Sequence, residues 1–386
     1  MADNRNKNII NPCRYIGRLF VIIIAVITIV NIITPQKKVS EEENRTLATR
    51  PKLTVNSVLT GTYMDKFEEY LQDQFLFRDE LRKFKTGVAR LGGAKKINDV
   101  FIGKNDQLLE DINVPKEEDI AANIEAVNKV SEKYPQVKFN MMLVPDAANI
   151  LKDSLPVLAD TNDQSALMNR VKKQLSESVN WIDVSKTLEE HKKEKIYYKT
   201  DHHWTSLGAF YAFKDAAPTL GIKEDVSSMF IPYTVCLDFN GTLAAMSGSK
   251  LDVEEQIDIY VPKDTEKELI VNYEEEQKKT TTLYDRKKLD TRDKYGVFLG
   301  GNSPLIDIRT LSGNSNRLLV VKDSFANCFI PFLTPFYREI VMVDPRYYTG
   351  SFNELIDVYG ITDVLFLYSG NTFFNDNNLS GVLCIE

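Results

Sequence analysis

The chain has 386 residues, 43% of them hydrophobic and 27% charged, and a formal net charge of −7. This length and balance predict a folded protein with a sizeable core, and they exclude a disordered or low-complexity chain. Residues 1–18 hold four basic residues and one acidic one, so the rest of the chain is more acidic still. An acidic protein lacks the basic surface that binds nucleic acid, so the composition argues against a nucleic-acid-binding protein.

A long apolar run from Leu19 to Ile33 follows the basic N-terminus, and no charge occurs from Leu19 to Gln36. The run is near the minimum of about 17 residues for a membrane-spanning helix. The basic flank places residues 1–15 in the cytoplasm and the bulk of the chain outside. No A-x-A-like cleavage site follows, so the sequence favours an uncleaved signal anchor over 16–35 rather than a signal peptide. We therefore expect a single-pass protein of the cell membrane with an extracytoplasmic body.

Residues 36–99 are predicted to connect this anchor to the catalytic domain. Residues 36–50 are charged and turn-rich, which is typical of a linker. Helical spacing then predicts an amphipathic helix near the bilayer or against the main domain, with its apolar face formed by Met64, Phe67, Tyr70, Leu71 and Phe75.

From Val100 to Glu386 the pattern alternates between helices and strands. A helix with apolar residues on one face precedes a buried strand at 138–145, and further strands are predicted at 179–184, 317–321, 339–343 and 364–368. This alternation predicts an α/β domain in three layers, with a mostly parallel sheet covered by helices on both sides. Ligands bind at the carboxyl ends of such strands, where we expect Asp146, Asp201, Asn302 and Ser324 to converge.

A charged segment from about 225 to 293 interrupts this pattern and is predicted to be a polar insertion. Within it, residues 238–242 form a turn sequence that can reach the cleft, whereas 274–294 is predicted to be solvated.

Two of the three histidines lie in Thr200-Asp201-His202-His203-Trp204, directly before a segment predicted to be helical from near Thr205. A histidine that acts as a general base needs a carboxylate on its other ring nitrogen, which fixes the tautomer and stabilises the imidazolium. Residues i and i+2 of an extended chain project to one side, so Asp201 is expected to touch His203 while His202 points away.

The best candidate for a nucleophile is Ser324. The buried strand before it ends at Lys322, and the apolar segment 325–333 after it is predicted to be helical. Ser324 would then lie at a helix N-terminus, where backbone N–H groups can hold an oxyanion and the turn exposes the hydroxyl. The motif G-x-S-x-G is absent, which argues against an ordinary α/β-hydrolase.

Candidates for a second oxyanion donor lie in Gly300-Gly301-Asn302-Ser303-Pro304. This segment follows an apolar stretch, 295–299, that is predicted to be a strand. Asn302 and Gly301 are the candidate oxyanion or substrate-binding residues. The same sequence is also an ordinary turn, and that alternative stays open.

Several of these residues have alternative roles. Asp201 and the histidines are possible metal ligands, but His191 lies in a charged surface run and no cysteine pair is present, so no metal and no cofactor are expected. His203 could simply cap the following helix. His202, Trp204 and Asp323 are expected to support the site from beside it, Trp204 chiefly through packing.

The four cysteines carry little functional signal. Cys13, Cys236, Cys328 and Cys384 are scattered, and Cys13 lies before the anchor, so no disulfide framework is predicted. Cys328, one turn after Ser324, is predicted to be a small buried side chain rather than a nucleophile.

Taken together, these motifs resemble the DHHW family and, more distantly, alginate O-acetylation proteins with an SGNH-hydrolase-like domain. The residues that carry the resemblance are Glu43-Asn44-Arg45, Arg50-Pro51, the Asp73-to-Arg78 run, the Val100-to-Lys104 run, Asp201-x-His203-Trp204 and the Lys322-to-Asn327 run. The resemblance implies Ser324 as nucleophile, His203 as base and Asp201 as the residue that orients the base. The Asp/His pair precedes the serine here, as in the alginate-type branch and unlike the wider SGNH pattern.

The function expected from this resemblance is O-acetyl transfer to a cell-surface or exported polysaccharide. The implied partners are the acceptor glycan, a membrane-bound O-acyltransferase that supplies acetyl groups, and the membrane itself. Three alternatives stay open: a carbohydrate acetylesterase, a noncatalytic polysaccharide-binding scaffold, and a metallohydrolase that uses Asp201 and His203.

Overall fold

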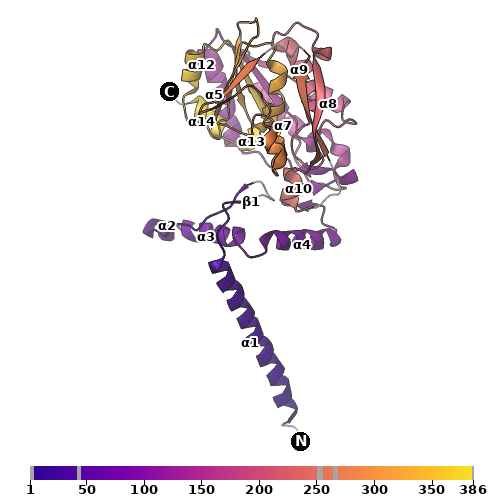
Figure 1. Cartoon of the computed structure of the whole chain (residues 1–386), viewed down its shortest axis with the longest axis vertical. Helices are drawn as coiled ribbons and strands as arrows, with labels where there is room; N and C mark the ends of the chain where they lie inside the picture. The colour runs from indigo at the N-terminus through magenta and orange to yellow at the C-terminus, as the bar shows by residue number, and fades with distance from the viewer. Residues whose placement is uncertain (1–3, 41–44, 250–254, 264–267, 385–386) are drawn as a thin grey trace. The chain divides into compact units, whose positions relative to one another are not determined.

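The computed structural model describes residues 4–40, 45–249, 255–263 and 268–384. They divide into two compact units, Met1–Gly92 and Gly93–Glu386, which Figure 1 colours from indigo to yellow along the chain. Glu43 and Asn44, which belong to the motifs named above, lie outside the described residues, and so does the side chain of Cys13.

The first unit is built around one long apolar helix, α1 (Asn4–Ile33), whose segment Arg14–Ile33 is long and apolar enough to cross a membrane and has no buried residue. Asn31 near its end accepts a hydrogen bond from the N–H of Leu76 at 2.8 Å. The remaining elements are the paired strands β1 (Val39–Ser40) and β2 (Arg45–Thr46) and the helices α2 (Val55–Leu59), α3 (Thr62–Asp73) and α4 (Arg78–Leu91).

The second unit contains an eight-stranded sheet in the order β11-β10-β12-β14-β13-β15-β6-β7. The five strands from β14 to β7 are mutually parallel, and β10, β11 and β12 extend one edge in antiparallel pairs. The parallel strands are β6 (Lys138–Val144), β7 (Val179–Trp181), β13 (Arg317–Lys322), β14 (Glu339–Val343) and β15 (Asp363–Ser369). The antiparallel strands are β10 (Leu269–Tyr273), β11 (Lys278–Thr280) and β12 (Leu305–Thr310).

Both faces of the sheet are covered, because its central strands carry buried apolar side chains on both sides. In β13, Leu318 and Val320 join one buried cluster while Leu319 and Val321 join another on the opposite face. Near-continuous apolar strands of this kind are typical of parallel sheets buried on both sides. The predicted three-layer α/β class with a mostly parallel sheet is therefore confirmed.

Each face has its own helices (Figure 1). The cluster with Leu319 and Val321 includes residues of α5 (Glu117–Lys133), α7 (Gln164–Gln174), α12 (Phe352–Tyr359), α13 (Gly370–Asn375) and α14 (Asn378–Leu383). The cluster with Leu318 and Val320 includes residues of α6 (Ala147–Ile150), α8 (Ser185–Glu190), α9 (Ser206–Thr219) and α11 (Ile330–Leu333). A small antiparallel sheet, β3 (Lys96–Ile97), β4 (Val100–Ile102) and β5 (Leu108–Glu110), precedes α5.

The segment predicted to be a polar insertion has more order than its charge suggests. It contains the antiparallel pair β8 (Phe230–Phe239) and β9 (Glu255–Pro262) with α10 (Thr242–Ser247) between them, and it supplies β10 and β11 to the main sheet. Leu283 is buried, so 274–294 is not uniformly solvated. Alternating side chains let one face of these strands pack while the other face keeps its charges in water.

Candidate active site

A tight loop between α8 and α9 presents Asp201, His202 and His203. The two ends of the loop run antiparallel and are joined by backbone contacts. Tyr197 and Trp204 form an antiparallel β-bridge, and the N–H of Thr205 donates to Ile196 O at 2.9 Å. Thr205 then caps α9, because its hydroxyl accepts from the N–H of Gly208 at 3.2 Å. The loop is thus held at its base and by the helix that follows it.

Three side chains from two distant parts of the chain form one line of hydrogen bonds. His203 Nδ1 lies 2.5 Å from Asp201 Oδ1, and His203 Nε2 lies 2.7 Å from Ser324 Oγ. A carboxylate only accepts, so Nδ1 carries the proton and Nε2 is left to accept the serine hydroxyl. Asp201 and His203 are buried, and Ser324 is half-buried. This is the mutual geometry of an activated serine.

Asp201 is held from its other side by a turn that lies 40 residues further along the chain. Its Oδ2 accepts the backbone N–H of Thr242 at 2.8 Å, so the predicted turn at 238–242 does reach the cleft. A Cβ on Gly241 would lie 2.3 Å from Asp201 Cβ, so only glycine fits here. Burial alone would raise the pKa of Asp201, but the nearby histidines and these hydrogen bonds outweigh it and hold that pKa below its ordinary value.

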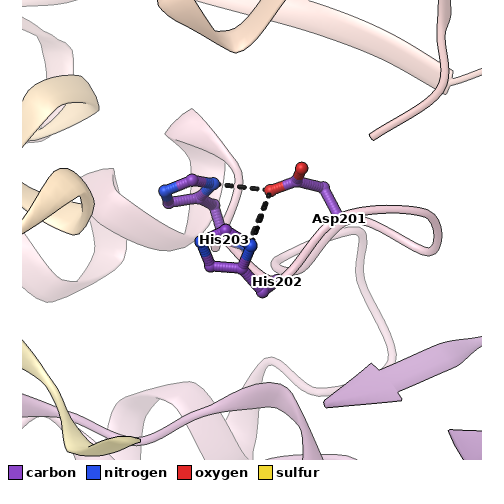
Figure 2. Close-up of side chains that lie close together, drawn as sticks. All are labelled: Asp201, His202 and His203. Carbon is purple, nitrogen blue, oxygen red and sulfur yellow. Dashed lines mark hydrogen bonds and ion pairs between the residues drawn. The ribbon is translucent and has the colours of Figure 1, made fainter. Parts of the chain in front are cut away.

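His202 does not point away from the other two residues, contrary to the expectation from extended-chain geometry. Its Nδ1 lies 3.8 Å from Asp201 Oδ1, and its ring centroid lies 3.9 Å from that of His203 (Figure 2). The reason is that the chain turns at this point instead of remaining extended. Burial opposes a charge on His202, but the carboxylates of Asp201, Glu110 and Asp146 outweigh it and raise its pKa.

Tyr295 also contacts His203, although no sequence pattern identified it as a site residue. Its ring stacks on His203 with centroids 3.8 Å apart and planes 10° apart, and its hydroxyl donates to the carbonyl of Ser324 at 3.3 Å. Burial first, and then the charge of His202, lower the pKa of His203. No local motif marks Tyr295, because its partners lie in two distant segments.

Ser324 follows the carboxyl end of β13 and begins the short 3-10 helix η6 (Ser324–Cys328). The segment 325–333, predicted to be helical, is helical in two pieces, η6 and α11. Asp323 caps the turn: its Oδ1 accepts from the N–H of Phe325 at 2.9 Å and its Oδ2 from that of Ser369 at 2.9 Å. Within the part of the chain that the structure describes, the N–H of Ser324 has no hydrogen-bond acceptor, so it is available to an oxyanion.

The Gly301–Asn302 turn lies beside the buried end of β13, although it does not follow a strand. The predicted strand at 295–299 is instead the 3-10 helix η5 (Lys294–Val297), because the backbone turns through positive φ at Leu299, Gly300 and Gly301.

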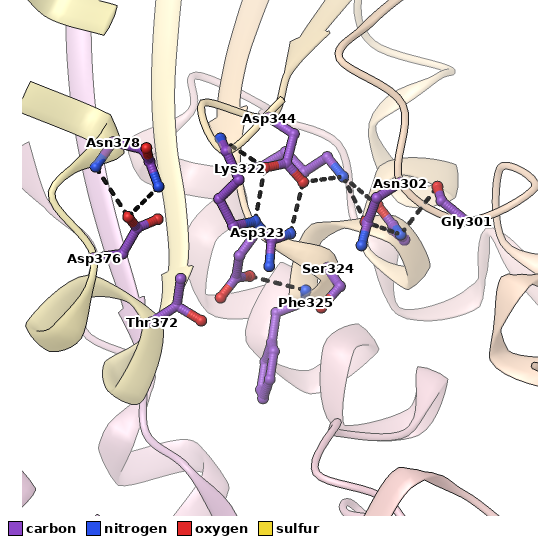
Figure 3. Close-up of polar contacts among 12 residues, drawn as sticks. Gly301, Asn302, Lys322, Asp323, Ser324, Phe325, Asp344, Thr372, Asp376 and Asn378 are labelled. Atoms are coloured by element: carbon purple, nitrogen blue, oxygen red, sulfur yellow. Dashed lines mark hydrogen bonds and ion pairs between the residues drawn. The ribbon is translucent and has the colours of Figure 1, made fainter. Parts of the chain in front are cut away.

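The carboxamide of Asn302 is oriented by two donors. Its Oδ1 accepts from Lys322 Nζ at 3.1 Å and from Asn327 Nδ2 at 3.2 Å (Figure 3). Since these contacts occupy the carbonyl end, the NH₂ end is left to donate elsewhere. Lys322 is fully buried and also contacts Asp344 Oδ2 at 3.4 Å, while Arg346 pairs with the same carboxylate at 2.6 Å.

Trp204 and Cys328 are packing residues. Trp204 is fully buried, donates from Nε1 to the carbonyl of Phe325 at 2.9 Å and stacks on Phe329. It therefore supports the serine turn and cannot contact a substrate. Burial raises the pKa of Cys328 to about 12, which keeps it a thiol. Cys236, Cys328 and Cys384 are free.

The ligand atoms of Asp201, His202 and His203 all lie within 4.8 Å of one another. Both ring nitrogens of His203 are already engaged, one by Asp201 and one by Ser324. A metal ion at this point would have to displace one of these partners and would face a His202 ring that favours its charged form. The arrangement therefore suits nucleophilic chemistry by serine better than a metal centre.

Several solved structures share this fold. A DHHW family protein from Eubacterium siraeum is 24% identical, with 73% of this chain and 97% of that chain covered and a TM-score of 0.62. Bacillus cereus PatB1, solved with a sulfonyl adduct, is 24% identical, with 72% and 97% covered and a TM-score of 0.60. The O-acetyltransferase domain of Pseudomonas putida AlgJ is 16% identical, with 73% and 94% covered and a TM-score of 0.47. No curated protein matches the chain.

At these identities the likenesses to the first two structures show a common fold. The family rests on a separate finding: the model described as DHHW protein matches residues 113–343, more than half of the chain, and that range contains Asp201, His203 and Ser324. The chain belongs to the DHHW family.

Proposed function

We propose that the protein is a membrane-anchored, extracytoplasmic O-acetyltransferase that acetylates a polysaccharide through an acyl-serine intermediate on Ser324. The observation that carries this proposal is the line of hydrogen bonds from Asp201 through His203 to Ser324, at 2.5 and 2.7 Å. A noncatalytic scaffold has no need of a buried carboxylate, an oriented imidazole and a serine in hydrogen-bond contact.

In this mechanism His203 Nε2 takes the hydroxyl proton as Ser324 Oγ attacks the acyl carbonyl of the donor. The tetrahedral intermediate collapses, and His203 returns the proton to the departing group, which leaves an acyl-serine. An acceptor hydroxyl then gives its proton to His203 and attacks the acyl carbon; as the bond from the acyl carbon to Ser324 Oγ breaks, His203 returns the proton to Ser324 Oγ. Asp201 remains ionised throughout and stabilises the imidazolium.

Two donors are proposed for the oxyanion. The N–H of Ser324 is one, and the carboxamide NH₂ of Asn302 is the other, since Lys322 and Asn327 already occupy its carbonyl oxygen. Gly301 gives this turn the positive φ of 105° that lets the chain pass the site. Each such donor is typically responsible for a factor of about 10² to 10³ in kcat.

Acetyl as the acyl group and a glycan as the acceptor follow from the resemblance of the Asp-x-His-Trp and Asp-Ser motifs to alginate O-acetylation proteins. The apolar run from Leu19 to Ile33 in α1, preceded by Arg14 and Arg18, supports an anchored protein whose body is outside the cytoplasm. The acetyl groups would then come from a membrane-bound O-acyltransferase. No cofactor takes part.

The test is turnover of a small acetyl ester by the full chain, with and without an oligosaccharide acceptor, compared with Ser324→Ala. We expect kcat to fall by about 10³-fold or more in the variant. Ser315→Ala, at an exposed serine, is the matched control. Acetylated oligosaccharide among the products selects a transferase, whereas acetate alone with acceptor present selects the esterase.

A second readout does not depend on the acyl donor. A sulfonyl fluoride reacts with activated serines, so mass spectrometry should locate its adduct on the peptide that contains Ser324, and the adduct should be lost in His203→Gln. Undiminished turnover by Ser324→Ala, or an adduct spread over exposed serines, would show that the triad is wrong. A wild-type protein that neither reacts nor turns over any ester would be a scaffold.

A further inference from the structure

Helix α4 carries an apolar stripe that the protein leaves uncovered. Phe77, Leu81, Phe84, Val88 and Leu91 recur at spacings of four and three residues, which places them on one side of a helix. Their exposed fractions range from 48% for Leu81 to 92% for Leu91. A helix on the surface of a soluble protein normally buries such a stripe against the rest of the protein. An uncovered stripe of this length is typical of a surface that binds a membrane or another protein.

The rest of the surface of α4 is mostly polar. Thr86, rotated about 180° from the stripe, is the buried residue of this helix. The helix also carries five basic residues and two acidic ones. An exposed apolar stripe bordered by Lys and Arg is the pattern of helices that lie in a membrane interface and contact anionic headgroups.

Hydrogen bonds fix where this region lies relative to the membrane-spanning helix. The segment Arg14–Ile33 has 20 residues, which at about 1.5 Å each matches a hydrocarbon core of about 30 Å. Asn31 in its last turn accepts from the N–H of Leu76, in the connection between α3 and α4, at 2.8 Å. Just beyond, Lys37 N–H donates to Gln74 Oε1 at 3.0 Å.

These contacts hold the start of α4 at the level where α1 leaves the bilayer. Figure 1 shows α3 and α4 running across the end of α1 rather than along it. Helix α3 adds the exposed apolar residues Met64 and Leu71, and the connection adds Phe75.

We propose that α3 and α4 lie in the outer interface of the membrane that α1 crosses. In this arrangement Phe84, Val88 and their neighbours enter the acyl-chain boundary, and Lys85, which is exposed beside the stripe, meets anionic phospholipid headgroups. The partner surface is the lipid bilayer itself. The inference concerns attachment, so it holds whether or not the protein is a transferase.

The test is the depth of a tryptophan placed on each side of α4 in the full chain, reconstituted in nanodiscs that contain phosphatidylglycerol. Phe84→Trp adds a tryptophan to the apolar stripe, and Arg90→Trp adds one to the opposite, exposed side as the matched control. Lipids brominated along the acyl chain quench tryptophans that reach them. Both sites are exposed, so neither variant disturbs a packed core.

We expect a blue-shifted emission from Phe84→Trp and a clear loss of intensity with brominated lipid, measured relative to the wild-type signal of Trp181 and Trp204. Arg90→Trp should show neither change. Equal quenching of the two variants, or none in either, would overturn the proposal. Emission of Phe84→Trp that is blue-shifted but not quenched would assign the stripe to a protein partner instead.

Discussion

His202 controls the base electrostatically although it makes no hydrogen bond with Ser324. Its ring lies 3.9 Å from that of His203, and the surrounding carboxylates favour its charged form. A charged neighbour makes a second positive charge less favourable, and this adds to the effect of burial in lowering the pKa of His203. His203 therefore stays unprotonated, and able to accept a proton, down to a lower pH than it would without the charge of His202.

Replacing His202 should move the pH dependence of the reaction. In His202→Gln the like charge is gone, so the pKa of His203 rises and kcat/KM falls at pH 6 while it changes little at pH 8. The measurement is the acid limb of the pH profile for a small acetyl ester. His191→Gln, at the exposed histidine stacked on Tyr211, is the control. An acid limb that stays at the wild-type pH would contradict this role.

Among the elements, the turn between β8 and α10 has the most direct effect on the site. The N–H of Thr242 donates to Asp201 Oδ2, and Gly241 N–H donates to the hydroxyl of Thr200 at 2.9 Å. Glu255 at the start of β9 accepts from Thr200 on its other side at 2.5 Å. A segment that looks like an insertion in the sequence therefore orients the carboxylate.

Gly241→Ala should lower activity more than stability. The added Cβ would meet Asp201 at 2.3 Å, so the turn must move and the bond from Thr242 weakens. A displacement of about 1 Å near a catalytic group typically lowers kcat by roughly 10²-fold. Steady-state kinetics and the thermal midpoint are measured together. Gly313→Ala, where nothing lies within 4 Å of the new Cβ, should match the wild type; full activity in Gly241→Ala would show that the turn is dispensable.

The elements that could be predicted are those with long apolar runs. The strands β6, β13, β14 and β15 lie where the sequence placed them, because buried parallel strands are apolar on both faces. The strand predicted at 295–299 was wrong, because a run of five residues has no decisive period. The segment 325–333 is helical as predicted, in the two pieces η6 and α11. Local features set the backbone of both segments: the positive φ at Leu299 turns the chain after η5, and the side chain of Asp323 caps η6.

At the scale of the whole molecule, acidic groups are collected at the carboxyl edge of the sheet. Burial, and then the charge of Glu110, raise the pKa of Asp146 to about 7, although Gln164 and the N–H of Asn371 donate to it. Burial likewise raises the pKa of Glu110. The folded protein therefore retains protons that the unfolded chain releases.

The sign of the resulting pH dependence is opposite to that of a salt-bridged carboxylate. Between pH 3.8, the ordinary pKa of this carboxyl group, and pH 7 the folded state binds more protons at Asp146, so stability falls as pH rises. The full difference is at most about 4 kcal/mol, at about 1.4 kcal/mol per unit. Asp146→Asn should flatten the fall of the unfolding free energy between pH 5 and 8. Asp160→Asn, at an exposed position, should leave the slope unchanged, and an unchanged slope in Asp146→Asn would refute the assignment.

Local periodicity and motifs of a few neighbouring residues were enough to predict the α/β layers, the apolar N-terminal helix and the residue types of the site. They did not predict which residues meet: His203 with Ser324, 121 positions apart, Thr242 with Asp201, Tyr295 with His203, and Lys322 with Asn302. These contacts form because loops from distant parts of the chain come together at one edge of the sheet. No local pattern encodes that arrangement, since it is fixed by the packing of both faces at once.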